Sequence, residues 1–297
     1  MTTITVIGAT GHIGQQLVPR LLAQGVKVRA VGRDAGRLQP LVEAGAEAWI
    51  GTVDSARSMA EAFRGADAAF AMIPPDYGHP QPAARAKAVA EALAAGAQVA
   101  RVTHVVTLSS VGAHLPTGVG PVNGLRGLEE RFNQVPGMNV LHLRAGYFME
   151  NLLNGIGVIE AMRVNGGALK ADLPVAMITT GDIAGVAAAR LTQRNFSGHG
   201  ARELLGPRNY THQEASLIIG EAIGMPGLGY VEFSYDDTRK ALLTFGFSEA
   251  SANEFIEMYD ALNTGRMQPS QPRTALTTTP TTLEEFARTV FAVAYGE

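Results

Sequence analysis

Three glycines near the N-terminus have the spacing of a nucleotide-binding turn. Gly8, Gly11 and Gly14 lie in the segment VIGATGHIG, directly behind the apolar run 4–7. In such a turn the first glycine permits a tight bend, the second lets the backbone approach a pyrophosphate, and the third lets a helix pack closely. The helix behind the turn offers free N–H groups and the positive end of its dipole to phosphates. The spacing therefore predicts a bound dinucleotide, and a plain strand-to-helix turn is the weaker interpretation.

Two arginines behind the second apolar run favour NADP(H) over NAD(H). Residues 26–31 are followed by Arg33 and Asp34, and Arg37 lies one helical turn further on. An acidic residue at this point binds the ribose 2′-hydroxyl of NAD, whereas a basic residue accommodates the 2′-phosphate of NADP. We expect Arg33 and Arg37 to bind that phosphate, and Asp34 to turn away and cap the next helix. The alternative is that Arg33 is an ordinary solvated arginine.

Strand-like and helix-like segments alternate through the first half of the chain. Strands are expected at 4–7, 26–31, 47–50, 68–72, 103–108 and 139–143, with helices at 13–23, 35–44, 58–63, 83–95 and 125–133. This alternation is typical of right-handed βαβ units, and the short apolar strands indicate a parallel sheet that helices cover on both faces. We therefore predict the α/β fold class, with a doubly wound parallel sheet of the Rossmann type over residues 1–150.

The alternation of strand-like and helix-like segments is less regular in the second half of the chain. Residues 151–297 are expected to form a smaller C-terminal α/β lobe that binds substrate and is intertwined with the first domain rather than independent. A strand pair is expected at 169–179, with helices at 182–191, 213–223 and 249–262. Thr282, with Glu285 three residues later, is typical of the start of a final helix.

The composition excludes several classes of function. The formal net charge of −3 leaves no basic face for direct nucleic-acid binding. The chain has no cysteine, so a disulfide framework, a thiolate zinc site and a thiol nucleophile are excluded, and its seven histidines lack metal-ligand spacing. The N-terminus is unlike a signal peptide, and charges interrupt every long apolar stretch. We expect a cytoplasmic protein with no membrane contact, a small-molecule substrate, and either a homodimer or a regulatory protein partner.

Several segments together resemble the NmrA-like family of atypical short-chain dehydrogenases. They are GATGHIG, VGR, TLSSVGA, LRAGYFMEN, GDIAGVAA and the C-terminal TTPTTLEEFARTVFA, so the resemblance runs over essentially the whole chain. It implies a Rossmann fold with a small C-terminal lobe and bound NADP(H). It also implies one of two activities, because some members reduce quinones or related carbonyl compounds and others are redox-sensing regulators.

Further cofactor contacts are expected around the glycine turn and at the ends of the strands. Thr52 stands where relatives often carry an aspartate near the adenine, which leaves Asp54 as its substitute. The other expected contacts are Thr10, His12, Ile13, Ile73, Pro74, Ser109 and Phe148.

The catalytic pair of ordinary short-chain dehydrogenases is missing. Those enzymes use a Ser or Thr with Tyr-x-x-x-Lys, but residues 120–132 here read GPVNGLRGLEERF, without tyrosine or lysine. Arg126 stands where some relatives keep a lysine, and an arginine does not release a proton at neutral pH. The remaining catalytic candidates are Ser110, or its neighbour Ser109, and Tyr147, whose phenol could donate to a substrate carbonyl. The alternative for Tyr147 is a core aromatic with a backbone partner.

Apolar and aromatic residues near the strand ends could form a pocket for a flat ring. The expected pocket residues are Pro75, Tyr77, Tyr147, Met149, Asn151 and Phe245, although Asn151 could instead cap a helix and the aromatics could be core. Hydride transfer to an easily reduced acceptor needs no acid–base residue, because the cofactor carries the chemistry. The leading hypothesis is therefore an NADP(H)-dependent reductase of quinone-like or activated carbonyl compounds. A catalytically weak NADP(H) sensor is the alternative, and the missing pair argues against a nucleotide-sugar epimerase.

Overall fold

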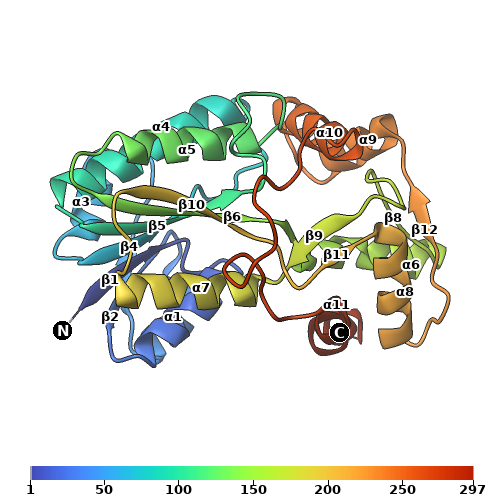
Figure 1. The fold of residues 1–297 in the computed structure, drawn as a ribbon, viewed down its shortest axis with the longest axis horizontal. Helices are drawn as coiled ribbons and strands as arrows, with labels where there is room; N and C mark the ends of the chain where they lie inside the picture. The colour runs from blue at the N-terminus through green and yellow to red at the C-terminus, as the bar shows by residue number, and fades with distance from the viewer. Residues whose placement is uncertain (1, 297) are drawn as a thin grey trace.

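The computed structural model describes residues 2–296, and its larger part is a seven-stranded parallel sheet (Figure 1). The strand order is β10-β6-β5-β4-β1-β2-β3. The strands are β1 (Thr3–Ile7), β2 (Lys27–Gly32), β3 (Glu47–Ile50), β4 (Ala68–Ala71), β5 (His104–Ser110), β6 (Asn139–Ala145) and β10 (His199–Leu204). The order reverses between β1 and β4, and such a switch point opens a crevice at the carboxyl edge of the sheet. The expected Rossmann-type α/β class is confirmed.

Helices cover both faces of the sheet (Figure 1). One layer contains α1 (Gly14–Leu22), α2 (Ala35–Glu43) and α7 (Thr180–Gln193), and the other contains α3 (Ala56–Phe63), α4 (Pro82–Val99) and α5 (Val122–Asn133). The apolar face of α1 is fully buried at Leu17 and Leu21, where it shares a core with Ala184 and Ala187 of α7. Burial on both faces explains why the strand sequences are continuous apolar runs and do not alternate between apolar and polar residues.

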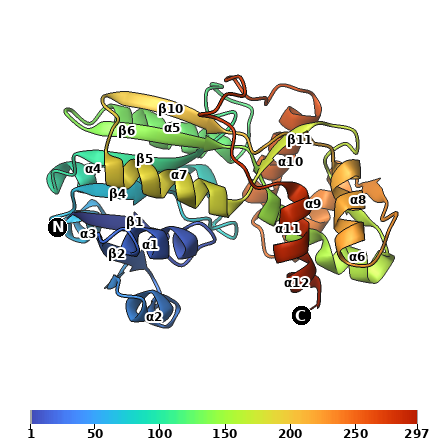
Figure 2. The same ribbon diagram turned by 60° about the horizontal axis from the view of Figure 1, so that its bottom comes forward.

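The second half of the chain forms a smaller lobe at the end of the molecule away from the N-terminus (Figures 1 and 2). Its sheets are β11 (Asn209–Tyr210), β9 (Val175–Ile178) and β7 (Tyr147–Phe148), and separately β12 (Tyr230–Glu232) with β8 (Asn165–Gly167). Its helices are the 3-10 segment Met149–Gly155, α6 (Ile156–Met162), α8 (His212–Ala222), α9 (Tyr235–Thr244), α10 (Glu249–Asn263), α11 (Leu283–Phe286) and α12 (Ala292–Gly296), the last two joined by π-helical turns at Ala287–Phe291.

The two lobes are not two separate stretches of the chain. After leaving the Rossmann layer the chain returns to it for α7 and β10, and β10 pairs in parallel with β6. Of the expected strand pair at 169–179, only β9 is a strand. β8 lies earlier and pairs with β12, more than sixty residues away, which no local pattern could indicate.

Side-chain caps begin several helices where local signals predicted them. Asp34 accepts a hydrogen bond from the N–H of Arg37, so it caps α2 as expected. Thr282 accepts one from the N–H of Glu285 at the start of α11. These caps satisfy N–H groups that have no partner within the first turn of a helix.

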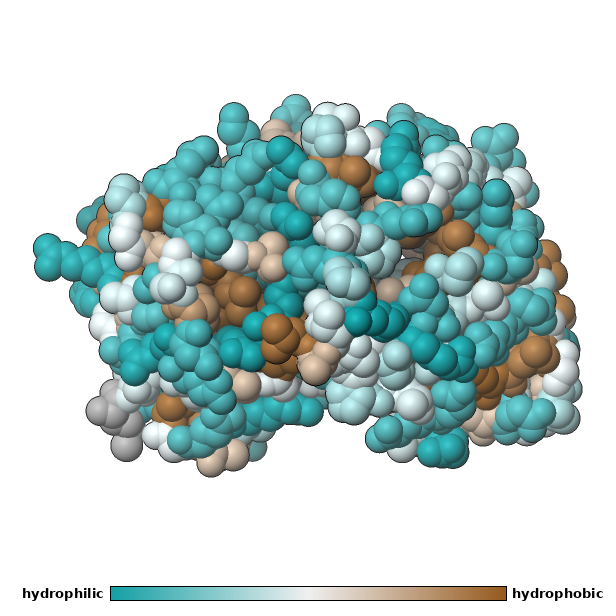
Figure 3. Space-filling model, in the orientation of Figure 1, coloured by the Kyte–Doolittle hydropathy of each residue, from teal (hydrophilic) through white to brown (hydrophobic). Residues whose placement is uncertain are grey.

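The face of the molecule in Figure 3 is mostly hydrophilic, and its apolar residues lie in separate small patches. Within residues 2–296, no helix has both the length and the apolar character that a membrane crossing requires.

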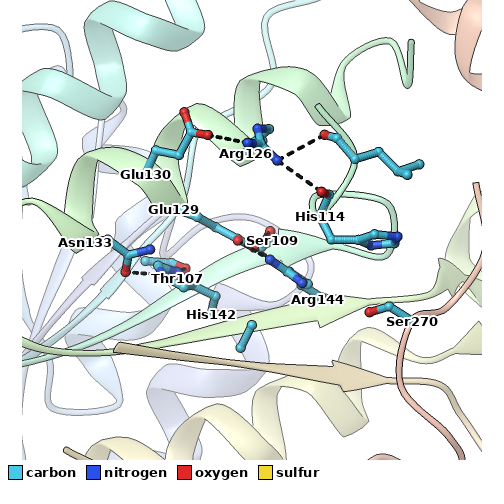
Figure 4. A network of polar contacts seen from close by, with 12 residues as sticks. Thr107, Ser109, His114, Arg126, Glu129, Glu130, Asn133, His142, Arg144 and Ser270 are labelled. Carbon is cyan, nitrogen blue, oxygen red and sulfur yellow. Dashed lines mark hydrogen bonds and ion pairs between the residues drawn. The ribbon is translucent and has the colours of Figure 1, made fainter. Parts of the chain in front are cut away.

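A buried polar network joins β5, β6 and α5 (Figure 4). Glu129 of α5 is only 5% exposed. Its Oε1 accepts hydrogen bonds from the Ser109 hydroxyl (2.5 Å) and from Arg144 Nε (2.9 Å), and its Oε2 accepts one from Arg144 Nη2 (2.6 Å). Burial raises the pKa of Glu129, but the hydrogen bonds from Arg144 and Ser109 outweigh burial and hold this pKa below its usual range. The pair is therefore ionised.

His142 is the neutral member of the network. Its ring nitrogens lie 2.7 Å from the Thr107 hydroxyl and 3.0 Å from Asn133 Oδ1. Both contacts suit a neutral imidazole that accepts from threonine and donates to the amide oxygen. Burial lowers the pKa of His142 to about 4, so the ring stays uncharged at neutral pH.

We expect the free energy of unfolding to decrease as the pH falls from about 7 to about 4. The pKa of His142 is about 4 in the folded chain, whereas that of an unperturbed histidine is 6.5, so the unfolded chain binds more protons in this window. His142 contributes fully to the free energy of unfolding when the pH is above its pKa in the unfolded chain. This contribution, at most about 3 kcal/mol, is lost as the pH falls toward its pKa in the folded chain. Urea denaturation at several pH values measures this loss.

His142→Gln keeps one donor and one acceptor but does not titrate, so its unfolding free energy should depend less steeply on pH. His12→Gln is the control, because His12 is exposed on the glycine turn and takes no part in this network. Equal slopes for His142→Gln and the wild type would contradict the assignment.

Candidate functional site

The glycine turn has the geometry that its spacing predicted. Gly8 has φ +71°, and a Cβ there would lie 2.5 Å from Met72 Sδ. A Cβ on Gly14 would overlap the carbonyl oxygen of Gly8 and the backbone of Ala9. A Cβ on Gly11 would meet only the Gly8 oxygen, at 3.4 Å, so the turn is open on that side. Two of the three glycines are thus required by the fold, and Gly11 is free for a ligand.

The start of α1 faces the same opening. Ile13 precedes the helix without a side-chain cap. The N–H groups of Gln15 and Gln16 donate to the carbonyl oxygens of Gly11 and Ile13, but among the described residues those of His12, Ile13 and Gly14 have no acceptor and remain for phosphate oxygens. Gly8, Gly11, His12, Ile13 and Gly14 all line one cavity. The turn therefore fits a pyrophosphate.

The basic residues lie beside the turn as expected. Arg37 Nη2 donates to the carbonyl oxygen of Thr10 (3.2 Å), so its guanidinium is anchored to the glycine turn. Arg33 is exposed and makes no ion pair or side-chain hydrogen bond within the described part of the chain. Asp54 is exposed in the turn between β3 and α3. Arg33 and Arg37 thus leave cationic groups at the end of β2, which fits a phosphate on the ribose.

A cavity of about 1550 Å³ extends from the glycine turn into the smaller lobe. The expected residues that line it are Ile73, Pro74, Pro75, Tyr77, Ser109, Ser110, Tyr147, Phe148, Asn151 and Phe245. Pockets for one small molecule have volumes of about 300–1,000 Å³. The cavity therefore has room for a dinucleotide and a second molecule.

Aromatic side chains from both lobes form one wall of the cavity. Tyr77, in the segment after β4, stacks on Phe247, with ring centroids 4.6 Å apart and planes 9° apart. Phe255 of α10 stands edge-on to both rings, with centroids 5.2 Å away. The N–H of Ser248 also donates to the carbonyl oxygen of Tyr77 (2.8 Å). These contacts join the two lobes and give the wall flat apolar surfaces.

Two expected pocket residues need correction. Met149 is fully buried in the core of the smaller lobe, where it packs with Leu152 and Ile159. Phe148, its neighbour, faces the cavity, so the chain presents alternate side chains to the two sides here. Phe245 ends α9 and is 80% exposed, so it lies at the rim rather than inside a pocket.

The serine candidates point in different directions. The Ser109 hydroxyl donates to the buried Glu129 carboxylate (Figure 4), although Ser109 also lines the cavity, so its contact with the cofactor stays a prediction. The Ser110 hydroxyl donates to the carbonyl oxygen of Val111 (2.9 Å) and lies at the cavity. Alternation along β5 accounts for the difference, because successive side chains face opposite sides of a sheet.

Arg126 has a structural role. Its Nη1 donates to the carbonyl oxygens of His114 (3.1 Å) and Leu115 (3.4 Å), and its Nη2 pairs with Glu130 at 2.8 Å (Figure 4). It thus fixes the loop after β5 against α5, and it does not line the cavity.

Tyr147 lies at the cavity beside a histidine that sequence reasoning missed. Its ring meets His212 edge to face, with centroids 5.5 Å apart, and His212 stacks on Tyr230 at 5.3 Å. Burial raises the pKa of Tyr147, so its phenol stays protonated at neutral pH. The only local signal at His212 is that it follows the cap Thr211 of α8, and this indicates a helix start rather than a site.

In residues 2–296, no three His, Cys, Asp or Glu side chains gather closely enough to hold a metal ion.

Comparisons with known proteins agree with this geometry. A family model described as NAD(P)H-binding matches residues 8–133. An NAD(P)H azoreductase of Xenophilus azovorans is 30% identical over 262 residues, which cover 86% of each chain. At this identity and coverage the relative shares a family with this protein, and the chain is of the NAD(P)H-binding oxidoreductase type.

Solved structures share the fold over almost the whole chain. An NADPH-dependent quinone oxidoreductase of Escherichia coli, complexed with NADPH, has a TM-score of 0.81 and 22% identity, with 98% of this chain and 100% of that chain covered. NmrA, a negative transcriptional regulator in complex with NADP, has a TM-score of 0.74 and 16% identity, with 99% and 97% covered. The glycine turn, the Rossmann sheet, the smaller lobe and these similarities lead to one assignment: the chain belongs to the NAD(P)H-binding, NmrA-like family of atypical short-chain dehydrogenases.

Proposed function

We propose that this protein uses NADPH to reduce a quinone-like or activated carbonyl compound by direct hydride transfer. One observation carries the proposal: a single cavity of about 1550 Å³ joins the glycine turn to an aromatic wall. A dinucleotide on the turn leaves space for a flat acceptor against Tyr77 and Phe247. The azoreductase and quinone oxidoreductase among the similar proteins support an acceptor of this kind.

The residues at the turn favour NADP(H). Gly11 leaves the backbone open to a pyrophosphate, and the uncapped start of α1 offers N–H donors. Arg33 and Arg37 bring two cationic groups to the end of β2, where the ribose of a dinucleotide lies in this fold. Asp34 would repel a phosphate, but its carboxylate is engaged with the backbone of α2.

The side chains around the acceptor suit a compound that is reduced easily. When bound, NADPH supplies the hydride. The chain orients the acceptor with the stacked rings of Tyr77, Phe247 and Phe255. The helix α5 contains no Tyr or Lys, so it offers no proton donor of the kind that ordinary short-chain dehydrogenases use. A quinone fits this site better than a plain ketone, because its reduced oxygens can take protons from water.

Tyr147 supplies a neutral hydrogen-bond donor at the cavity. Its pKa is raised by burial, so it stabilises charge that develops on an acceptor by donating a hydrogen bond rather than by titrating.

Redox sensing is a second candidate function. The observation that favours it concerns α5 and Ser109, which in ordinary short-chain dehydrogenases would take part in proton transfer. Here Glu129 of α5 accepts hydrogen bonds from Ser109 and Arg144 in the protein interior. A sensor must bind NADP⁺ and NADPH with different affinities, because a ligand shifts a conformation only through differential binding. Equal affinities would argue against sensing.

Steady oxidation of NADPH should follow the addition of quinones, and plain ketones should support much slower turnover. Absorbance of NADPH during turnover of a panel of quinones, azo compounds and ketones measures this. A flat trace with every acceptor would overturn the proposed reduction.

Arg33→Glu should weaken NADPH binding roughly 10- to 100-fold and leave NADH binding nearly unchanged, because a charge-assisted contact to the 2′-phosphate is lost. Calorimetric titration of both dinucleotides measures the two affinities. Lys27→Glu is the matched control, since Lys27 is exposed at the other end of β2. Equal losses for both dinucleotides would refute the assigned preference.

Tyr147→Phe should lower kcat/KM roughly tenfold or more with an activated carbonyl acceptor, because one donor to the developing negative charge is removed. The wild-type rate should not show the ionisation of this phenol between about pH 6 and pH 9, since burial raises its pKa. Tyr295→Phe, in the C-terminal helix, should retain the wild-type rate. An unchanged rate for Tyr147→Phe would leave Tyr147 as a core aromatic only.

A further inference from the structure

His212 is a buried polar side chain in the wall of the cavity. It is the first residue of α8, is 4% exposed, and lines the cavity that begins at the glycine turn. Its Nε2 is buried without a hydrogen-bond partner. The ring lies between Tyr147, which meets it edge to face, and Tyr230, which stacks on it.

An unpaired ring nitrogen of this kind needs an explanation. Buried polar atoms almost always have a partner, because a buried donor or acceptor without one loses the hydrogen bonds that it would make with water. The hydroxyl of Tyr230 is satisfied, because it donates to the carbonyl oxygen of Leu169 (2.9 Å). His212 and the hydroxyl of Tyr147 are left with unused hydrogen-bonding capacity at one place in the cavity.

This part of the cavity carries no charge. The lining residues between positions 145 and 230 include no Asp, Glu, Lys or Arg. The charged residues of the lining lie between positions 76 and 131 or, in the case of Glu254, on α10. Burial also lowers the pKa of His212 to about 4 and raises that of Tyr147, so both groups are neutral at physiological pH.

We propose that His212 and the Tyr147 hydroxyl form a charge-free polar subsite that binds the carbonyl oxygen of a neutral aromatic acceptor and discriminates against anionic acceptors. A carbonyl oxygen has two lone pairs, and the Nε2–H tautomer of His212 and the phenol supply two donors. An anionic substituent would enter a region with no countercharge, where an unpaired charge is costly.

This inference rests on the proposed function, because it assigns a role to His212 in binding the same acceptor. It adds a selection by charge among aromatic acceptors. The chain has no cysteine, so a quinone can be titrated without alkylating a thiol.

Equilibrium binding separates the subsite from turnover. The protein, saturated with NADP⁺, is titrated by calorimetry with naphthoquinone and with naphthoquinone sulfonate. The neutral quinone should bind at least about tenfold more tightly than the sulfonate. His212→Phe, which keeps an aromatic ring, should bind the neutral quinone about 3- to 10-fold more weakly.

Two further variants test whether the loss of quinone affinity in His212→Phe comes from the lost hydrogen bond. His212→Gln keeps an N–H donor and should restore most of the affinity that His212→Phe loses. His199→Gln changes an exposed histidine and should bind like the wild type. NADPH affinity and thermal melting of each variant verify that the fold is intact.

The outcomes distinguish the two proposals. If the wild type binds NADPH but not naphthoquinone, the proposed acceptor class is overturned. If the wild type and His212→Phe bind naphthoquinone equally, or the sulfonate binds as tightly as the neutral quinone, the subsite is overturned while the reductase proposal stands.

Discussion

The geometry of the site depends on the hydrogen bonds and the ion pair that the buried carboxylate of Glu129 makes. It binds Ser109 at the end of β5 and Arg144 near the end of β6, and it comes from α5. Removing one partner of such a pair leaves an uncompensated buried charge, which costs about 3–5 kcal/mol. Because β6 continues almost directly into β7, this pair also fixes the start of the segment that places Tyr147 and Phe148 at the cavity.

The same pair explains why α5 contributes no acid–base group. The helix directs Glu129 and Asn133 toward the sheet, where they satisfy Ser109, Arg144 and His142, and it directs Arg126 toward the loop after β5. The neutral donors proposed for the acceptor, Tyr147 and His212, therefore lie outside α5. Tyr147 and His212 are neutral, so they can donate hydrogen bonds to an acceptor over a wide range of pH.

The cavity depends on the interleaving of the two halves of the chain. α7 and β10 return to the Rossmann layer, and the segment after β4 reaches the α9–α10 connection through Tyr77 and Phe247. The wall that would hold an acceptor is thus shared by residues 170 positions apart in the sequence. A cofactor on one lobe and an acceptor against the other meet at the carboxyl edge of the sheet, which is where ligands bind in this class of fold.

The amino-acid sequence by itself determined what local chemistry controls. The glycine turn, the strands of the parallel sheet, and the caps at Asp34 and Thr282 each depend on residues a few positions apart, so their patterns predicted them. Only the tertiary structure decided which way individual side chains face. It turned Ser109 toward Glu129 and set His212 against Tyr147, which are contacts between residues 20 and 65 positions apart, and it buried Met149 in the core of the smaller lobe. The physical reason is that the direction of these side chains depends on packing between distant elements, which leaves no local pattern in the sequence.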